Sequence, residues 1–589
     1  MLSILVKQKS TKDLNMPQCI PTQSDIVKLY PIWTLSYSQA IPYMLSPFIY
    51  YLLFLLVLKL IMVRQLSLSS TASTAIVFGI AYYLYHLQQQ QQKKTRNVGS
   101  LPPRAPGYIP IIGHLLQLVK PFPIQELFYQ WSRQVGPVFM CHFGTQRWLI
   151  LNSFEAIKDL IVDRGTIYSS RKLPDTLVYD AMQGEEGGGF AFFPYGTSWR
   201  RLRRIAHGGL VKNKIDEYQP ILDDRRIVLL SHLHNLSQDA KANLNKGVCL
   251  TNFIEHYTMT AILAIAFGDM CNFEPNDPVL HKAFAITERA ASTMSPADQL
   301  REFFPILKVI WPVKREKYFR VRNDSTEFYG KLLEKFKKTM ETYGEDAVQD
   351  CFVKEVFKLN ELTDLQIMNF IGIFVGAGSE TTASTLEWLV AFLANNPEVQ
   401  RKAFEEIKQV VGTDRLPGSC DEPHLPYLQC IILETLRLRP PAPIAIPHST
   451  TKDDVYKNWV IPQDTIVVLN LYAAHQDSKR FANPKLFNPD RHMPYVKETL
   501  NQQRKTFAQS IEDRPHLSFS TGRRVCVGIH LAERSLFMAA SMLVSCFKID
   551  YVGKPIPVDS QKDIRAPTWT PASYRVCLTP RHENVGRFY

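Results

Sequence analysis

The pattern of apolar and polar residues along most of the chain is typical of amphipathic helices. Apolar residues recur every three or four positions in four long stretches, at 223–236, 331–343, 365–395 and 533–546. Short runs typical of β-strands occur at 138–151, 459–469 and 574–578. Neither a solenoid-type repeat nor a long low-complexity linker divides residues 101–589. The pattern therefore predicts one large, mainly helical domain with small β-sheets.

Two apolar runs precede this domain. Residues 44–63 are numerous enough to cross the hydrocarbon core of a bilayer, and Lys59 stands near their end, where a lysine can reach the interface. Residues 72–87 form a shorter run rich in tyrosine. A buried core helix is the alternative for either run. The basic segment Lys93–Arg96 follows them, and an excess of basic residues marks the cytosolic side of a membrane.

These features predict four parts of the chain. Residues 1–43 form a polar extension, and residues 44–100 form a membrane anchor of one or two transmembrane helices with a basic flank. The prolines in residues 101–113 favour an extended, stiff hinge. The globular domain occupies residues 114–589.

Composition excludes several classes of protein. Of the 589 residues, 46% are apolar, which excludes intrinsic disorder. The 68 basic and 55 acidic side chains give a net charge of +13, which favours anionic membranes, acidic proteins or nucleic acid without choosing among them. The ten cysteines include no Cys-x-x-Cys pair, which argues against a zinc site and a disulfide-stapled scaffold.

One cysteine stands in a context that suggests metal binding. The segment FSTGRRVCVG, residues 519–528, immediately precedes a helical pattern. The positive end of that helix and two neighbouring arginines favour the thiolate form of Cys526, and a thiolate is a metal ligand. Gly522 and Gly528 allow a tight turn and the close approach of a flat ligand. An isolated cysteine is more often a small buried apolar residue, so the surrounding residues carry this prediction.

The stretch 365–395 carries a second constellation. Thr363 with Gln366 predicts a capping box at the start of a helix, and Asn395–Pro397 predicts its end after about 31 residues. Ionisable residues are absent from 365–379, and then Glu380 and Thr381 appear within the apolar pattern.

This constellation has three interpretations. A glutamate facing solvent and a threonine bonding back to its own helix is the ordinary one. Alternatively, residues 376–378 (GAG) thin the helix wall so that a flat cofactor and a diatomic ligand can lie against it. A G-x-G-x-x-G dinucleotide fingerprint fails, because Thr381 replaces its third glycine and the motif lies inside a helix.

Together with weaker motifs, these segments resemble the cytochrome P-450 family in the order in which that family carries them. The match to its haem-binding signature F-x-x-G-x-R-x-C-x-G comprises Phe519, Gly522, Arg524, Cys526 and Gly528. The match to its oxygen-activation motif A-G-x-(D/E)-T-(T/S) comprises Ala377, Gly378, Ser379, Glu380, Thr381 and Thr382. The weaker matches are Trp199 with Arg203 (W-x-x-x-R), Glu434 with Arg437 (E-x-x-R), Arg491, and His448.

One segment departs from the family pattern. Glu434 and Arg437 alone would indicate a solvated ion pair on a helix face. In the family this pair joins an arginine in a P-E-R-F segment. Residues 489–492 read PDRH here, so Arg491 is retained while Asp and His replace Glu and Phe.

The resemblance implies a fold and a cofactor site. It implies the triangular-prism, mainly helical cytochrome P-450 fold with small β-sheets, preceded by a transmembrane anchor. It implies haem b with Cys526 as the axial thiolate. The other cofactor-binding residues it implies are Trp199, Arg203, Ala377, Gly378, His448, Phe519, Gly522, Arg524 and Gly528. It makes Thr381 and Glu380 the residues that position dioxygen and relay protons, and Glu434, Arg437 and Arg491 a structural ion network.

The implied activity is that of a haem-dependent monooxygenase. Such an enzyme inserts one atom of dioxygen into a lipophilic organic substrate, with electrons from NADPH. No flavin-binding or ferredoxin-like extension is visible, so the expected partner is a separate NADPH-cytochrome P-450 reductase, with cytochrome b5 as a second candidate and no nucleic acid. The expected location is the endoplasmic reticulum membrane, with the catalytic domain facing the cytosol.

Two other functions stay open at this point. One is a non-catalytic haem-thiolate protein that binds or senses a gas, and the other is a reductase-independent haem-thiolate isomerase or dehydratase. Glu380 and Thr381 favour oxygen activation over both. The sequence does not select among sterol, fatty-acid, polyketide, terpenoid and xenobiotic substrates.

Overall fold

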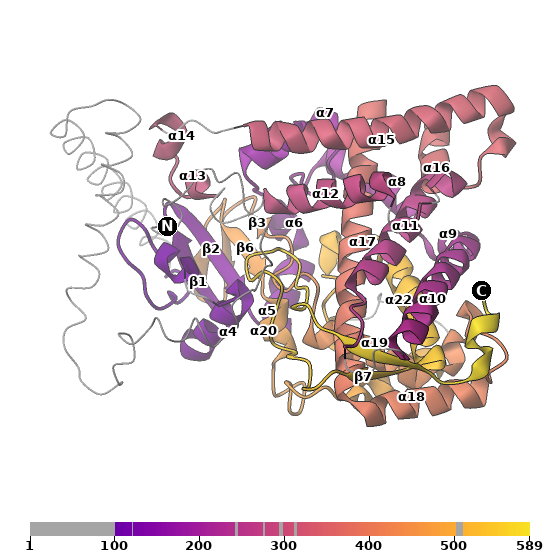
Figure 1. The fold of residues 1–589 in the computed structure, drawn as a ribbon. Helices are drawn as coiled ribbons and strands as arrows, with labels where there is room; N and C mark the ends of the chain where they lie inside the picture. The colour runs from indigo at the N-terminus through magenta and orange to yellow at the C-terminus, as the bar shows by residue number, and fades with distance from the viewer. Residues whose placement is uncertain are drawn as a thin grey trace, which may run out of the picture. The chain divides into compact units, whose positions relative to one another are not determined.

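Helices form most of the described part of the chain, and the long helix α17 (Asp364–Asn395) lies among them (Figure 1). The computed structural model describes residues 100–119, 122–241, 246–271, 273–274, 277–293, 299–310, 315–501 and 511–589. These residues belong to one unit of the chain, Ile80–Tyr589. The mainly helical architecture with small sheets confirms the fold class predicted from the sequence.

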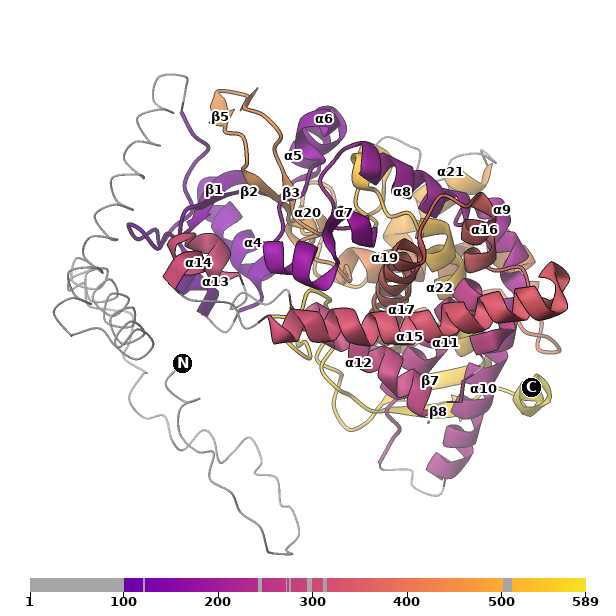
Figure 2. The same cartoon turned by 90° about the horizontal axis from the view of Figure 1, so that it is seen from above.

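The helices before α17 are α4 (Ile124–Val135), α5 (Phe154–Ile157), α6 (Gly165–Tyr168), α7 (Gly184–Gly187), α8 (Thr197–Gly208), α9 (Lys212–Glu217), α10 (Gln219–Lys241), α11 (Thr251–Phe267), α12 (Pro278–Ser292), α13 (Leu300–Phe303), α14 (Ile306–Ile310), α15 (Glu316–Tyr343) and α16 (Phe352–Leu359). The helices after it are α18 (Pro397–Val410), α19 (Pro426–Leu438), α20 (Leu471–His475), α21 (Met493–Asn501) and α22 (Ile529–Cys546). Figure 2 shows α15 crossing over α17, with α11 and α12 alongside.

The strands form one larger and two smaller sheets within the described residues. The strands are β1 (Val138–Phe143), β2 (Gln146–Leu151), β3 (His448–Ser449), β4 (Asp454–Tyr456), β5 (Trp459–Ile461), β6 (Ile466–Leu469), β7 (Phe547–Tyr551) and β8 (Val576–Pro580). The larger sheet has the order β1-β2-β6-β3, and only its β2–β6 pair is parallel. Strands β4 and β5 form one antiparallel two-stranded sheet, and β7 and β8 form another.

The start of α17 follows from its sequence. Thr363 Oγ1 accepts a hydrogen bond from the Gln366 amide over 3.3 Å, and Gln366 Oε1 accepts one from the Thr363 amide over 3.2 Å. These two bonds form the predicted capping box. The helix ends before Pro397, as predicted, and its 32 residues extend over about 48 Å.

The other predicted elements are found with shifted boundaries. The stretches 223–236, 331–343 and 533–546 lie inside α10, α15 and α22, each of which begins earlier than predicted. The stretch 138–151 is the β1–β2 hairpin. The stretch 459–469 divides into β5 and β6, which belong to different sheets, because residues between them form a turn rather than one continuous strand.

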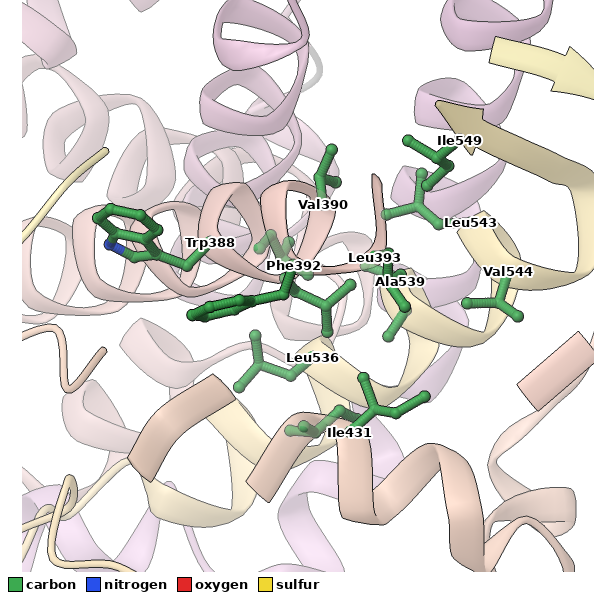
Figure 3. Close-up of a cluster of buried hydrophobic side chains, with 14 of the residues drawn as sticks. Trp388, Val390, Phe392, Leu393, Ile431, Leu536, Ala539, Leu543, Val544 and Ile549 are labelled. Carbon is green, nitrogen blue, oxygen red and sulfur yellow. The ribbon is translucent and has the colours of Figure 1, made fainter. Parts of the chain in front are cut away.

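A buried apolar cluster joins α17 to the C-terminal part of the domain. Figure 3 shows Trp388, Phe392 and Leu393 of α17 beside Leu536 and Leu543 of α22. Each of these side chains is at most 3% exposed. Burial of large apolar side chains is the main stabilising contribution to a fold. This cluster therefore fixes α17, which carries one motif, relative to α22, the helix that follows the cysteine loop.

Residues 101–113, the predicted hinge, first follow β1 and then turn back on themselves, because the amides and carbonyls of Ile109 and Gly113 bond each other. The Met140 amide donates to the Pro103 carbonyl over 2.7 Å, and the Ala105 amide donates to the Met140 carbonyl over 3.0 Å. Ala105 and Ile112 are buried. The segment thus extends the edge of β1, because its apolar residues pack on the domain.

The predicted anchor lies outside the described residues, as do both apolar runs and the polar extension. From residue 100 onward, the described part of the chain contains no helix that is both long and apolar enough to cross a membrane. The domain boundaries proposed from the sequence stay predictions.

Candidate active site

Cys526 stands at the end of a tight loop, just before α22. Its amide donates a hydrogen bond to the Phe519 carbonyl over 2.8 Å, which closes the loop. Gly522 turns the chain within the loop at φ +64°, and a Cβ atom there would lie 2.6 Å from the Ile161 carbonyl oxygen. Both the left-handed backbone and the close approach demand glycine. Gly528 is the N-cap residue of α22, so Cys526 precedes the helix start as predicted.

The groups that act on the Cys526 thiol come from the helix start and from α8. Enclosure by the surrounding protein raises the pKa of the thiol although the side chain itself is solvent-exposed, while the donating Gly528 amide and the charge of Arg203 lower it. The two arginines of the loop point elsewhere: Arg523 donates to a tyrosine hydroxyl and Arg524 to backbone carbonyls. The helix start therefore favours the thiolate through the Gly528 amide, as expected from the sequence, whereas the favourable positive charge comes from Arg203 of α8 and not from the two arginines of the loop. A coordinated metal ion would deprotonate the thiol.

Two buried arginines form a basic cradle near this loop. Arg524 donates to the carbonyls of Ser169 and Phe193 over 2.9 and 2.6 Å. Arg171 donates to both carbonyls of Ile446–Pro447. Within the described residues, Arg524 Nη1 and Arg171 Nε are buried without a hydrogen-bond partner. Burial lowers the pKa of Arg524 to about 9 and also lowers that of Arg171, to which the charge of Arg524 contributes.

His448 borders the same cradle. It is 1% exposed, and its Nδ1 lies 2.7 Å from the Tyr168 carbonyl oxygen. Burial, with the charges of Arg171 and Arg524, lowers the pKa of His448 to about 3. His448 is therefore a neutral hydrogen-bonding group, and the positive charge of the cradle comes from the arginines.

Helix α8 supplies the two remaining residues of the cradle. The guanidinium carbon of Arg524 lies 4.3 Å from the centre of the Trp199 ring, a cation–π contact. Arg203, one turn later, donates from Nη2 to the Val525 carbonyl over 2.6 Å. The structure thus brings Trp199, Arg203, Arg524 and the cysteine loop together, as the sequence predicted.

The residues present fit an iron porphyrin with two carboxylates. Buried guanidinium groups are normally compensated by anions, and Arg171 and Arg524 have only carbonyl partners here. Cys526 itself is exposed. A Cβ atom on Gly528 would meet no atom within 4 Å, so nothing in the described protein demands glycine there. Carboxylates in the cradle, iron at the sulfur and a flat ring against Gly528 would account for all three observations.

The oxygen-activation motif lies in the middle of α17. Thr381 Oγ1 donates to the Ala377 carbonyl over 2.7 Å, which is the bond back to the helix of the ordinary interpretation. Ala377 is exposed, whereas Val375 and Ser379 on either side are buried. The surface of α17 is therefore exposed at Ala377, and the carbonyl of Ala377 is bonded to the hydroxyl of Thr381.

Only one of the three small residues at this point faces open space. A Cβ atom on Gly378 would lie 2.8 Å from Ile262 Cδ1 on α11. A Cβ atom on Gly376 would lie 3.6 Å from Thr287 on α12. Gly378 therefore allows α11 to pack against α17, and Ala377 is the one of the three whose side chain is exposed.

Glu380 is largely enclosed and does not face open solvent. Burial raises its pKa, and this effect is opposed by a hydrogen bond from Thr568 and by the charge of Lys562. The negative charge of Glu255 adds to the rise. Glu380 therefore stays protonated to higher pH than an ordinary glutamate, which suits a group that passes protons on.

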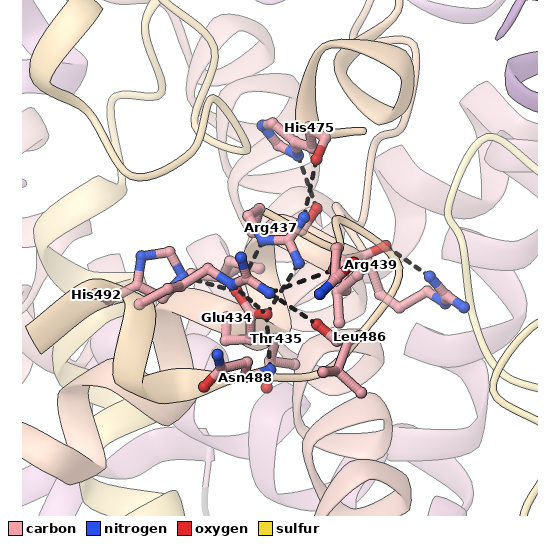
Figure 4. Close-up of polar contacts among 12 residues, drawn as sticks. Glu434, Thr435, Arg437, Arg439, His475, Leu486, Asn488 and His492 are labelled. Atoms are coloured by element: carbon pink, nitrogen blue, oxygen red, sulfur yellow. Dashed lines mark hydrogen bonds and ion pairs between the residues drawn. The ribbon is translucent and has the colours of Figure 1, made fainter. Parts of the chain in front are cut away.

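The Glu434–Arg437 pair is fully buried rather than solvated. Both side chains are 0% exposed, and Arg437 binds the carboxylate through Nε at 2.7 Å and Nη2 at 2.9 Å (Figure 4). Arg491 Nε bonds Glu434 at 3.1 Å, so the structure brings Glu434, Arg437 and Arg491 into one network. His492, where the family pattern has Phe, adds a hydrogen bond from Nε2 to Glu434 over 2.7 Å. The departure from the pattern thus contributes a further donor to the same carboxylate.

Two residues of this region were not found from the sequence. Arg171 stands in the cradle because its segment pairs with β3 through the bridge between Ser170 and Ser449. His475 contacts Arg437 and Leu517, which leads into the cysteine loop. Neither residue belongs to a recognisable sequence motif, so only the tertiary contacts show that they lie at the site.

Comparison with known proteins gives concordant results. A sequence profile of the family described as Cytochrome P-450 matches residues 102–578. The chain is 29% identical over 530 residues to cytochrome P-450 monooxygenase 58 of Postia placenta, covering 88% of this chain and 95% of that protein. It is 31% identical over 503 residues to cytochrome P-450 monooxygenase fogE of Aspergillus ruber, covering 82% and 88%. A solved structure of a zebrafish cytochrome P-450 with progesterone superposes with a TM-score of 0.64 at 25% identity, covering 78% of this chain and all of that one.

Proposed function

Because the chain belongs to the cytochrome P-450 family, we propose that it is a haem-dependent monooxygenase. Its reaction would place one atom of dioxygen on an organic substrate and reduce the other to water. The observation that carries the proposal is the cysteine loop beside the basic cradle of Arg171 and Arg524, a site with a metal ligand and uncompensated buried positive charge. The alternative functions of gas binding and isomerisation lack a supporting observation of their own.

Each residue of the site would have a separate role in this reaction. Haem bound to Cys526 supplies the oxygen and electron chemistry. Arg171, Arg524 and His448 hold and orient the carboxylates of the cofactor. Thr381, whose hydroxyl lies beside the exposed Ala377, would hold dioxygen and a water molecule. Glu380, with its raised pKa, delivers protons to that water.

Electrons would come from NADPH through a separate reductase, with cytochrome b5 as a further donor. Support comes from the exposed basic side chains Arg200, Arg201 and Arg204 on α8, the helix that also contacts the cysteine loop. Arg204 is paired with Glu361 in the free protein. An acidic partner would compete for these arginines, so turnover with a reductase should fall as ionic strength rises. Turnover independent of salt would contradict this docking surface.

We further propose that the protein is anchored in the endoplasmic reticulum membrane and that its catalytic domain faces the cytosol. The apolar runs at 44–63 and 72–87 and the basic segment that follows them support this orientation. A lipophilic substrate entering from the bilayer fits this location. Protease protection of microsomes would test it: residues from 100 onward should be digested from the cytosolic side, and their protection would refute the orientation.

The optical spectrum of the reduced protein with carbon monoxide tests the proposed cofactor site. Thiolate and imidazole ligation of haem give distinct bands, and we expect the thiolate band. Cys526→Ala should abolish that band. Cys430→Ala is a matched control, because Cys430 is a buried cysteine of α19 outside the site and its loss should leave the band intact. A native spectrum in the Cys526→Ala protein would refute the site.

Oxygenase activity is a separate test. The spectroscopically active protein, combined with a reductase and NADPH and screened against lipophilic compounds, should consume NADPH and dioxygen and release oxygenated product. Rearranged or dehydrated product formed without NADPH would instead establish the isomerase or dehydratase function.

A further inference from the structure

A single histidine connects the buried ion network to the cysteine loop. His475 ends α20 and is 0% exposed. It is joined to Arg437 twice: Arg437 Nη1 donates to the His475 carbonyl over 2.8 Å, and His475 Nδ1 lies 2.8 Å from the Arg437 carbonyl oxygen (Figure 4). On its other side, His475 Nε2 lies 2.7 Å from the amide nitrogen of Leu517. The imidazole therefore bridges α19 and the segment that leads to Cys526.

The partners of the ring dictate its tautomer. An amide N–H can only donate, so Nε2, which faces Leu517, must be the unprotonated acceptor. A carbonyl can only accept, so Nδ1, which faces the Arg437 carbonyl, must carry the hydrogen. His475 is thus a neutral ring with one donor and one acceptor, both in use. Burial and the charge of Arg437 lower its pKa to about 3, in agreement with this state.

The bond to Leu517 reaches the cysteine through a short series of backbone contacts. The Leu517 carbonyl accepts a hydrogen bond from the Ser520 amide over 2.7 Å. Ser520 has a positive φ of 58°, so this turn is held in a conformation that a serine rarely adopts. The carbonyl of Phe519, two residues after Leu517 and inside this turn, accepts the bond from the Cys526 amide. A shift of Leu517 would therefore move the turn on which the cysteine amide depends.

A second contact, of a different kind, holds the neighbouring residue. Ser518 Oγ donates to the Leu436 carbonyl over 2.6 Å, again at the end of α19. This bond is made by a flexible side chain, whereas the bond from Leu517 is made by the backbone itself. The histidine thus bonds a main-chain amide of this segment directly to the residue that holds Arg437.

We propose that His475 is a positioning residue for the axial ligand: through Leu517 it transmits the fixed position of the Glu434–Arg437 pair to the loop that holds the Cys526 sulfur. The proposal rests on the proposed function, because it takes Cys526 as the iron ligand. It predicts that the bond to Leu517, rather than the bond to Arg437, determines how long the iron–thiolate bond survives.

Two conservative substitutions separate these bonds. In His475→Gln the side-chain amide reaches the place of Nε2, where its oxygen can accept from the Leu517 amide. In His475→Asn the shorter amide reaches the place of Nδ1, where its nitrogen can donate to the Arg437 carbonyl, while the Leu517 amide loses its partner. Both variants are polar and similar in size, so they differ chiefly in which bond is kept.

The measurement is the lifetime of the thiolate band of the reduced, carbon-monoxide-bound full-length protein at a fixed temperature below unfolding. An unsatisfied buried amide should shorten this lifetime roughly tenfold in His475→Asn. His475→Gln should stay within about twofold of the unmodified protein. Melting of secondary structure, followed by circular dichroism, shows separately whether each variant is folded.

A matched control tests for a merely structural effect. Gln400, which is 2% exposed, also pins a backbone segment, because its side chain bonds both the amide and the carbonyl of Ile549. Gln400→Leu should lower the melting temperature and leave the lifetime of the thiolate band unchanged.

The outcomes separate this proposal from the proposed function. Equal lifetimes in His475→Asn and His475→Gln would overturn the positioning role, whether both are long or both are short. A shortened lifetime in Gln400→Leu equal to that of His475→Asn would overturn it as well. Absence of a thiolate band in the unmodified protein would instead refute the assignment of Cys526. If His475→Asn fails to fold, His475→Ala replaces it and hydrogen exchange of the Leu517 amide is measured. The proposal requires this amide to exchange faster in folded His475→Ala than in His475→Gln.

Discussion

Replacement of Glu434 by glutamine should destabilise the protein far more than replacement of an exposed carboxylate with the same pKa. Glu434 is 0% exposed and accepts hydrogen bonds from Arg437, Arg491, His492 and the Asn488 amide. Glutamine keeps the shape of the side chain but removes its charge. The arginines then stay buried without an anion, which is the condition under which loss of one ion-pair partner is costly.

The size of the effect follows from the pKa. Burial opposes ionisation of Glu434, but its hydrogen bonds to Arg437 and His492 outweigh burial and lower the pKa from the ordinary 4.5 to about 2. At 1.36 kcal/mol per pH unit, this corresponds to about 3 kcal/mol in favour of the ionised, folded state. Breaking a buried pair typically costs about 3–5 kcal/mol, which agrees with that value.

Urea unfolding of the haem-loaded protein, followed by circular dichroism, measures the loss. Glu327→Gln is the control: Glu327 also has a pKa lowered to about 2, chiefly by its hydrogen bonds to Lys331 and Lys282, but it is exposed and screened by water. We expect Glu434→Gln to lose about 3 kcal/mol and Glu327→Gln to change little.

The pH dependence gives a second check on the same residue. Because the folded-state pKa of Glu434 is depressed, its contribution is complete above about pH 4.5 and is lost as the pH falls toward 2. The difference between the unmodified protein and Glu434→Gln should therefore be constant from pH 5 to 8 and shrink below that range. A loss of less than about 1 kcal/mol, or one no larger than in the control, would refute the reasoning.

Two further predictions concern α17. Thr381→Ala should retain haem and the thiolate band but divert reducing equivalents to hydrogen peroxide, because the hydroxyl beside Ala377 is no longer there to hold dioxygen and water. The amount of product formed per NADPH consumed measures this. An unchanged ratio would contradict the role assigned to Thr381. Gly378→Ala should lower stability by about 1–3 kcal/mol, because its Cβ would stand 2.8 Å from Ile262 Cδ1. Adding Ile262→Val removes that atom and should restore part of the melting temperature; an additive loss in the double variant would argue against the clash.

The elements with strong local signals were predicted well. The capping box at Thr363 and the proline after Asn396 delimit α17 through contacts within a few residues, so the sequence contains the whole cause. The turn at Gly522 and the helix start after Gly528 are local in the same sense. The division of 459–469 into two strands was missed, because the partners of each strand come from distant parts of the chain.

Electrostatic predictions were less successful, since they depend on burial. The arginines next to Cys526 in sequence turn away from it, and Arg203 from α8 approaches instead. The spacing of Glu434 and Arg437, taken alone, predicts a solvated ion pair on a helix surface, yet both side chains are fully buried. Sequence spacing locates charged groups along a helix but contains no information about the dielectric environment around them.

By itself, the sequence determined the family, the mainly helical fold class, the cysteine loop and the identity of the groups that could perform the chemistry. These features rest on residue type and short spacing, which the chain displays directly. Only the tertiary structure decided which arginines surround the site, that Gly378 serves helix packing while Ala377 stays open, and that His475 joins the ion network to the cysteine loop. The physical reason is that hydrogen bonds and charge interactions act over a few ångströms in space, and folding alone brings together residues that are far apart in the chain.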